Sequence, residues 1–470
     1  MPTAAAPYAD GEPNDSMTQQ TGEDAGPGHA ADTESQDPAV HRAAAAVKRA
    51  AGDELGGLAH LVAAETLEAR DFASQSSRAQ GICDVATGYF MKGDFETAAG
   101  WYRLALKIDP RLAVAYQNLA AIYAGAGRIA EAESCREQAY QIQRVFIEHA
   151  GGPQRRVLIL CAGRTSGNVP FDTLMPTTTC CRIKYVIDYA ADAEDGALPA
   201  FDLAFNAIGE PDVAAALAGR MERFAARCDR PILNPPAAIA RTQRHNLFAL
   251  LGDLEDVVVA PCIRFETPAP SRAAMADCLD AAGIAFPVLA RPAATHGGEG
   301  LTRCDTMKDL EIWLHTCRGS HYLTSFRDFR SADGMYRKYR TIFVDRIPYP
   351  YHLAISPRWM VHYFSAGMEN SGSKIDEERI FLQQPGTVLG PRGKAAVAAI
   401  GRRLDMDFGG IDFALLPDGR VFVFEANATM LVHRERSNGA LAHKNINVQS
   451  IVDAFERMLI RRTVAQVGSE

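Results

Sequence analysis

Apolar residues recur at helical spacing from about residue 41 to residue 150. Within this stretch Tyr89 and Gly93 return 34 positions later as Tyr123 and Gly127, each time between two apolar segments. Each copy predicts a helix, a tight turn at the glycine and a second helix, and the many alanines let paired helices pack closely. A plain bundle of helical hairpins would show the same spacing, so this pattern alone leaves a repeat array and a bundle open.

The pattern changes after Gly151-Gly152-Pro153, a segment that breaks the helical spacing and predicts a domain boundary. Short apolar runs typical of buried strands follow, with a helical segment at about residues 211–227. Strands that alternate with helices predict a parallel α/β sheet. The predicted strands are Val157–Leu160, Ile183–Ile187, Asp202–Asn206 and Pro231–Asn234.

Near the C-terminus, Gly409–Asn427 predicts a hairpin that turns at Asp418-Gly419. A two-residue turn there, or a four-residue loop around it, places Asp412 directly opposite Glu425. Because side chains alternate between the two faces of a strand, Asn427 points to the same face as Glu425.

Opposed carboxylates in an apolar hairpin repel each other unless a cation neutralises them. Carboxylate and amide oxygens suit Mg²⁺ (or Mn²⁺), which keeps further coordination positions for phosphate and water. Asp412, Glu425 and Asn427 are therefore candidate metal ligands. The alternative is a pair of solvated surface carboxylates, which the apolar neighbours Phe422 and Phe424 disfavour.

Two further segments carry candidate phosphate contacts. The apolar run Val288–Pro292 contains Arg291 and leads into the Gly-rich segment Thr295–Gly300, whose backbone N–H groups could approach phosphate oxygens. By itself such a loop is more often an ordinary turn. Arg340 precedes the apolar strand Thr341–Val344 and is suited to brace a phosphoryl group or an acyl phosphate, or else is a surface charge at a strand start.

The helical repeat resembles tetratricopeptide repeats in its period and in its helix–turn–helix unit. This resemblance implies two repeats capped by flanking helices, with a surface that would bind a peptide or protein. A dimer contact or a packing arm is equally open.

Residues 155–462 resemble the ATP-grasp superfamily, near its glutathione synthetase-like branch. Leu233–Arg241 looks like the segment that leads into the ATP-binding domain of that family, and Arg291 stands where a lysine is usual. Tyr322–Phe326 looks like the interdomain strand whose backbone reads adenine. The resemblance assigns cofactor contacts to Arg291, His296, Gly297, Gly298, Gly300, Thr324 and Phe326, and the metal to Asp412, Glu425 and Asn427.

The resemblance implies an ATP- and Mg²⁺-dependent ligase that joins a small-molecule or peptide carboxylate to an amine through an acyl phosphate. Arg340 would stabilise the acyl phosphate, and Arg434 would meet an anionic substrate. The Asp-Lys pair that usually follows the linker is absent, so Arg244 or His245 replaces its lysine or nothing does. If nothing does, the chain is a repeat-based scaffold that binds nucleotide without ligation. A third alternative is another ATP-grasp reaction, such as phosphoryl transfer or carboxylation.

The composition restricts the class of protein and the kinds of partner that we expect. Of the 470 residues 47% are hydrophobic and 23% charged, which is typical of globular domains. Residues 1–40 contain eight acidic residues and no Lys or Arg, and the net charge of −8 leaves the rest of the chain near neutrality. This balance argues against nucleic-acid or anionic-membrane partners. No apolar run reaches the roughly 18 residues of a membrane span, and no secretory signal is recognisable. Ten cysteines without CxxC spacing indicate free thiols in the cytoplasm.

The expected fold class is therefore multidomain, α followed by α/β. We expect a disordered acidic tail (1–40), a helical tetratricopeptide-type domain (41–150), an α/β pre-ATP-grasp domain (155–240) and a two-lobed α+β ATP-grasp domain (241–462).

Overall fold

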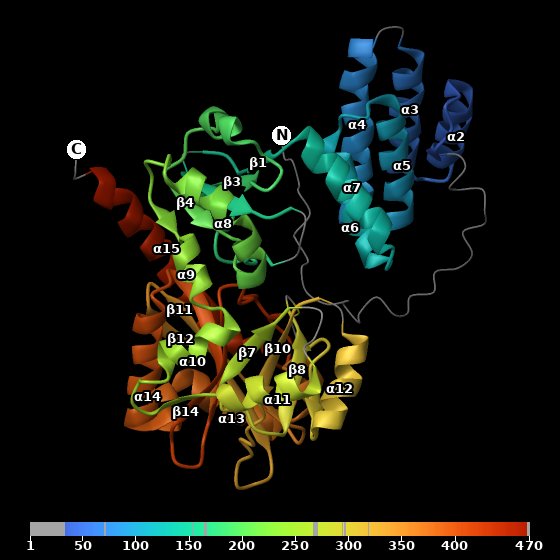
Figure 1. Ribbon diagram of the computed structural model, residues 1–470. Helices are drawn as coiled ribbons and strands as arrows, with labels where there is room; N and C mark the ends of the chain where they lie inside the picture. The colour runs from blue at the N-terminus through green and yellow to red at the C-terminus, as the bar shows by residue number, and fades with distance from the viewer. Residues whose placement is uncertain are drawn as a thin grey trace. The chain divides into compact units, whose positions relative to one another are not determined.

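The computed structural model describes most of the chain as two compact units (Figure 1). The first unit runs to Ala150 and includes Ile183–Leu198, and the second holds most of the chain from Gly151 onward. The expected acidic tail lies outside the described residues up to residue 32. The structure describes residues 33–69, 72–152, 154–163, 167–266, 271–293, 295, 298–317 and 319–467.

The described residues of the first unit form three helical hairpins with one turn geometry. At each turn a glycine adopts positive φ: 79° at Gly52, 82° at Gly93 and 72° at Gly127. The residue after each glycine donates its backbone N–H to the carbonyl five residues earlier, as in a Schellman helix end. Sequence predicted the last two hairpins, and the first repeats their turn. The hairpins are α2 (Pro38–Ala50) with α3 (Glu54–Glu68), α4 (Phe72–Met91) with α5 (Phe95–Ile108), and α6 (Ala113–Gly125) with α7 (Ile129–Ile142).

The first unit also holds β1 (Val145–Glu148) and most of β3 (Cys180–Val186), where the sequence predicted a strand. A short 3-10 helix, η2 (Asp192–Ala197), follows. Lys184 of β3 and Glu148 of β1 are both buried, and their side chains form an ion pair of 2.5 Å.

The second unit begins with the predicted parallel strands. β2 (Arg155–Cys161) pairs in parallel with β4 (Leu203–Asn206), and β4 pairs in parallel with β5 (Ile232–Leu233). Their side chains are almost wholly buried, as continuous apolar runs in parallel sheets are. The helical segments here are α8 (Pro211–Ala225), α9 (Pro236–Ala240), η3 (Arg244–Asn246) and α10 (Leu247–Leu251).

Two antiparallel-rich sheets complete the second unit. A four-stranded sheet has the order β7-β10-β8-β9, with an apolar core that includes residues of the helices α11 and α12. A five-stranded sheet has the order β12-β11-β13-β14-β6. Their strands are β6 (Val257–Val259), β7 (Cys262–Phe265), β8 (Val288–Pro292), β9 (Thr302–Cys304), β10 (His321–Ser325), β11 (Tyr336–Val344), β12 (Ile347–Ser356), β13 (Phe408–Leu415) and β14 (Val421–Asn427).

The five-stranded sheet has an apolar core on each face. Residues of α13 and α14 pack on one face, and α15 packs on the other together with the parallel strands. Ile342 and Val344 of β11 belong to the α15 face, which is also the face of Arg340. This face is therefore apolar beside α15 and polar beyond it. The remaining helices are α11 (Arg272–Ala281), α12 (Met307–Thr316), η4 (Phe364–Ala366), η5 (Met368–Asn370), α13 (Gly372–Gln383), α14 (Pro385–Leu404), η6 (Ala442–Lys444) and α15 (Asn445–Val467).

The β13–β14 hairpin has the predicted register at Asp412 but reaches it differently. Neither predicted turn is present, because Leu415 pairs with Val421. The loop between these strands has its glycine, Gly419, at φ 82°. A β-bulge next to Asp412 then shifts the register by one residue, so that Asp412 pairs with Glu425. The extra bulge residue restores the register that the loop had shifted by one residue.

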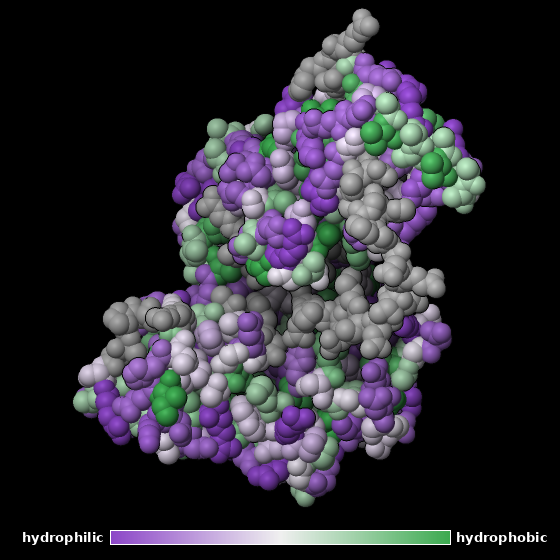
Figure 2. All heavy atoms as spheres, turned by 90° about the vertical axis from the view of Figure 1, so that its right-hand side faces the viewer, coloured by the Kyte–Doolittle hydropathy of each residue, from purple (hydrophilic) through white to green (hydrophobic). Residues whose placement is uncertain are grey.

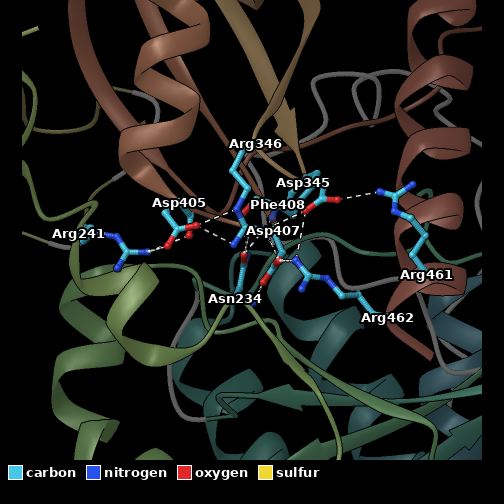
Figure 3. A network of polar contacts seen from close by, with 9 residues as sticks. All are labelled: Asn234, Arg241, Asp345, Arg346, Asp405, Asp407, Phe408, Arg461 and Arg462. Atoms are coloured by element: carbon cyan, nitrogen blue, oxygen red, sulfur yellow. Dashed lines mark hydrogen bonds and ion pairs between the residues drawn. The ribbon is translucent and has the colours of Figure 1, made fainter. Parts of the chain in front are cut away.

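A buried asparagine joins β5 to β13 (Figure 3). Asn234 is 0% exposed, and its Oδ1 accepts hydrogen bonds from the backbone N–H groups of Asp407 and Phe408, both at 3.0 Å. Its Nδ2 donates to the carbonyl of Phe408 at 2.7 Å. We call Asn234, Asp407 and Phe408 the latch. The latch fixes the start of the strand that carries Asp412.

Hydrophilic residues cover most of the face seen in Figure 2, and hydrophobic residues form smaller groups among them. Among the described residues, no helix is long and apolar enough to cross a bilayer. All ten cysteines are free thiols.

Candidate active site

Four polar residues form a row across four neighbouring strands of the five-stranded sheet. His352 of β12 pairs with Arg340 of β11, Arg340 pairs with Asp412 of β13, and Asp412 pairs with Glu425 of β14. Residues paired across strands share a face, so the four side chains emerge on one side of the sheet. The predicted phosphate-bracing arginine and two predicted metal ligands are therefore adjacent.

Asp412 is 1% exposed and is neutralised by two cations. The guanidinium of Arg340 binds both of its carboxylate oxygens, at 2.6 and 2.9 Å, and Lys338 Nζ lies 3.0 Å from Oδ2. Burial by itself would raise the pKa of Asp412, but the charges of Arg340 and Lys338 outweigh it and hold this pKa well below its usual value. Asp412 is thus a carboxylate at neutral pH.

Glu425 faces two other arginines. Arg244 Nη2 donates to its Oε2 at 2.5 Å, and Arg291 Nη1 lies 3.9 Å from the same oxygen. Burial opposes ionisation of Glu425, but Arg244 lowers its pKa despite the repulsion from Asp412. Of the two residues considered in place of the missing lysine, Arg244 is the one at this carboxylate. His245 instead stacks on Tyr322 with ring centroids 6.1 Å apart.

The oxygen donors fit a magnesium ion in part. Asp412 and Glu425 supply two opposed carboxylates, and Mg²⁺ typically takes one or two protein carboxylates and keeps several waters. Asn427 Oδ1 accepts hydrogen bonds from the backbone N–H and hydroxyl of Thr429, both at 2.6 Å, so its lone pairs are engaged. Among the described residues no three His, Cys, Asp or Glu side chains gather as a metal site. A metal here would rest on two carboxylates.

Arg291 lies on β8 of the four-stranded sheet and is held by the segment that follows it. Its Nη2 donates to the carbonyl of Thr295, and to the Thr295 hydroxyl at 3.2 Å. Burial and the nearby charge of Arg244 lower the pKa of Arg291 to about 10, so it remains a cation at neutral pH. Gly298 and Gly300 have φ of 86° and 64°, conformations that favour glycine. His296 and Gly297 lie outside the described residues.

The predicted adenine strand is β10, which ends at Ser325. Thr324 pairs with Leu289 of β8. Phe326 follows the strand, donates its backbone N–H to the carbonyl of Pro287 at 2.8 Å, and places its ring 5.5 Å from that of Trp359.

Arg434 is apart from the row. It is exposed, and its Nη2 donates to Gln449 of α15. Among the described residues, no hydrogen bond or ion pair joins it to Arg340 or Asp412.

The sequence did not single out Lys338 as a site residue. Lys338 lies two positions before Arg340 on β11, so both side chains point to the same face. The signal in the sequence was the presence of two cations, Lys338 and Arg340, at alternate positions just before an apolar strand. His352 was not among the candidate site residues. It is buried, and burial together with Arg340 and Lys444 lowers its pKa well below the usual value, which keeps its imidazole neutral.

No protein-family model matches the chain, and no curated protein is similar to it in sequence. Several solved structures are distantly similar. The VanG D-Ala:D-Ser ligase from Enterococcus faecalis is 11% identical with a TM-score of 0.40, over 65% of this chain and 100% of that one. A RimK domain ATP-grasp protein from Sphaerobacter thermophilus is 15% identical with a TM-score of 0.39, over 64% and 98%. The D-cycloserine synthetase DcsG is 14% identical with a TM-score of 0.37, over 63% and 99%. Because these TM-scores are below 0.5, the likeness carries no argument about function.

Proposed function

We propose that the chain is an ATP- and Mg²⁺-dependent carboxylate–amine ligase of the ATP-grasp type. The observation that carries the proposal is the charge arrangement around the opposed carboxylates. Asp412 and Glu425 are contacted by four cations, Lys338, Arg340, Arg244 and Arg291. Glu210 also acts on Arg244 and Arg291. With its charge included, one positive charge is left over, and the phosphate chain of a nucleotide with its Mg²⁺ would compensate it.

Each residue then has a role in holding charge. Arg291 and Arg244 would bind phosphate oxygens, and Arg340 would stabilise the acyl phosphate after the substrate carboxylate attacks the γ-phosphate. Asp412 and Glu425 would hold Mg²⁺, which would supply positive charge against the charge that develops on the phosphates. Catalysis would come from positioning and electrostatics rather than from a protein nucleophile.

The buried His352 suits the later step of this reaction, in which the amine would displace phosphate from the acyl phosphate. A neutral imidazole beside Arg340 adds no repulsion towards an incoming ammonium group. The substrates would be a carboxylic acid and an amine, of small-molecule or peptide size. The helical hairpins of the first unit would be tetratricopeptide-type repeats that present a surface to a peptide or protein.

The test is Mg²⁺-dependent ATP binding measured by calorimetry. We expect wild type to bind and Glu425→Gln to bind at least about tenfold more weakly, because the variant removes one ligand charge but keeps its shape. Glu377→Gln is the matched control, because Glu377 forms an ion pair with Arg337 and is not part of the row. If wild type does not bind Mg-ATP, the ligase is refuted. Binding without ADP release, across a panel of acids with hydroxylamine as the trapping amine, would favour the scaffold.

A further inference from the structure

A cavity of about 290 Å³ lies beside the latch. Part of its lining is apolar and comes from the segment Pro231–Ala238, which contains β5 and the start of α9. The rest is charged and includes Arg241, Arg346 and Arg462. The volume is close to the lower end of small-ligand pockets, about 300 Å³. No role in the proposed ligase reaction involves this cavity.

The charges around the cavity are unbalanced (Figure 3). Four arginines contact three aspartates, at distances from 2.7 to 3.4 Å. The cluster therefore carries one uncompensated positive charge. The four arginines, which we call the arginine cluster, are Arg241, Arg346, Arg461 and Arg462; the aspartates are Asp345, Asp405 and Asp407.

Two members of the arginine cluster keep donors for a ligand. Arg462 uses only Nη2, towards Asp345 at 3.2 Å and Asp407 at 3.0 Å. Arg241 uses Nε and Nη2, towards Leu404 and Asp405. Within the described part of the chain, Arg462 Nε and Nη1 and Arg241 Nη1 have no protein acceptor. Both side chains line the cavity.

The backbone around the cavity is held in an uncommon conformation. Among the described residues five non-glycine residues have positive φ, and four of them belong to this network. Arg346, with φ 69°, has the least suitable side chain for that region, since asparagine and aspartate tolerate it better. Asp345 and Arg346 form the two-residue turn between β11 and β12, and Asp405 ends α14. A tight hairpin turn and a helix end therefore hold these charged side chains beside the cavity.

We propose that this cavity binds a small anion with an apolar body, either a carboxylate or a phosphate monoester. The anionic group would take the free donors of Arg241 and Arg462 and balance the fourth guanidinium. The apolar body would lie against the wall formed by Pro231–Ala238. The site is distinct from the row at Asp412 and does not depend on the proposed ligase activity.

Calorimetric titration of the full chain tests this site with three probes: inorganic phosphate, phenyl phosphate and benzoate. We expect phenyl phosphate or benzoate to bind more tightly than inorganic phosphate, because only these two carry an apolar ring that can pack against the apolar wall. Whichever of the two binds more tightly identifies the anionic group. Arg462→Met should weaken binding by about tenfold or more, since it removes charge-assisted hydrogen bonds.

Arg403→Met is the matched control, because Arg403 pairs with Asp253, lies outside the arginine cluster and does not line the cavity. It should change the affinity by about threefold at most, as expected for an exposed ion pair. Arg241→Met, at the end of α9, guards against misfolding of one variant and should weaken binding as Arg462→Met does. The proposal is overturned if wild type shows no saturable binding of any probe, or if Arg462→Met and Arg241→Met bind as tightly as Arg403→Met. Either result would leave the cluster as a purely structural link.

Discussion

Replacing Asn234 with alanine should destabilise the second unit by about 4 kcal/mol. The change removes the acceptor of two backbone N–H groups and the donor to the carbonyl of Phe408. Each buried group left without a partner costs about 1–3 kcal/mol. Asn234 also has φ 51°, where alanine costs about 1 kcal/mol more than asparagine. Partial relaxation around the truncated side chain should keep the total loss of stability below the sum of these separate contributions.

The assay should report on the second unit alone, because a chain of two compact units need not unfold in one step. Hydrogen exchange followed by mass spectrometry meets this need. We expect amides of β13 to lose protection in Asn234→Ala, whereas those of α5 keep it. Asn234→Gly should recover about 1 kcal/mol relative to alanine, because glycine adopts positive φ freely.

Asn438→Ala is the control, since Asn438 is exposed and makes no hydrogen bond in the described structure. The reasoning is refuted if Asn234→Ala leaves the protection of β13 within about 1 kcal/mol of wild type. The latch would then contribute little beyond the packing of the strands around it.

Two further predictions concern stability. Gly410→Ala places a Cβ 2.7 Å from a backbone oxygen of β11, so it should lower the stability measured by thermal unfolding by about 1–3 kcal/mol. The control is Gly372→Ala, whose added Cβ meets no described atom within 4 Å beyond the nearby backbone of its own helix and which should be near neutral in the same measurement. Burial would raise the pKa of Glu435, but His433 and Lys444 lower it to about 2, below the unfolded value of about 4.3. Its ionisation therefore stabilises the fold above about pH 4.3, and this contribution is lost as the pH falls towards 2. Glu435→Gln should be less stable than wild type by about 2 kcal/mol near pH 6, and urea unfolding at lower pH should show the difference shrink; a constant difference would contradict this account.

Much of the local structure could be predicted from the sequence. The spacing of apolar residues located the helical hairpins and the parallel strands, because burial of one face imposes a period on each element. The same spacing did not predict the hairpin at Gly52, because its helices lie outside the repeat that relates Gly93 to Gly127. The pairing of Asp412 with Glu425 is confirmed, although the predicted turn is wrong. A bulge is a tertiary compensation that alternation along a strand does not reveal.

The sequence by itself determined which residues share a face: Asp412 with Glu425 across one hairpin, and Lys338 with Arg340 along one strand. The second relation depends only on the two-residue period of a strand, whereas the first depends also on the register of the hairpin. The tertiary structure decided which charges meet: it placed Arg244 rather than His245 at Glu425, put Arg434 against α15, and closed the latch across a separation of 173 residues. Such contacts arise when packing brings distant strands together, and no local periodicity encodes that geometry.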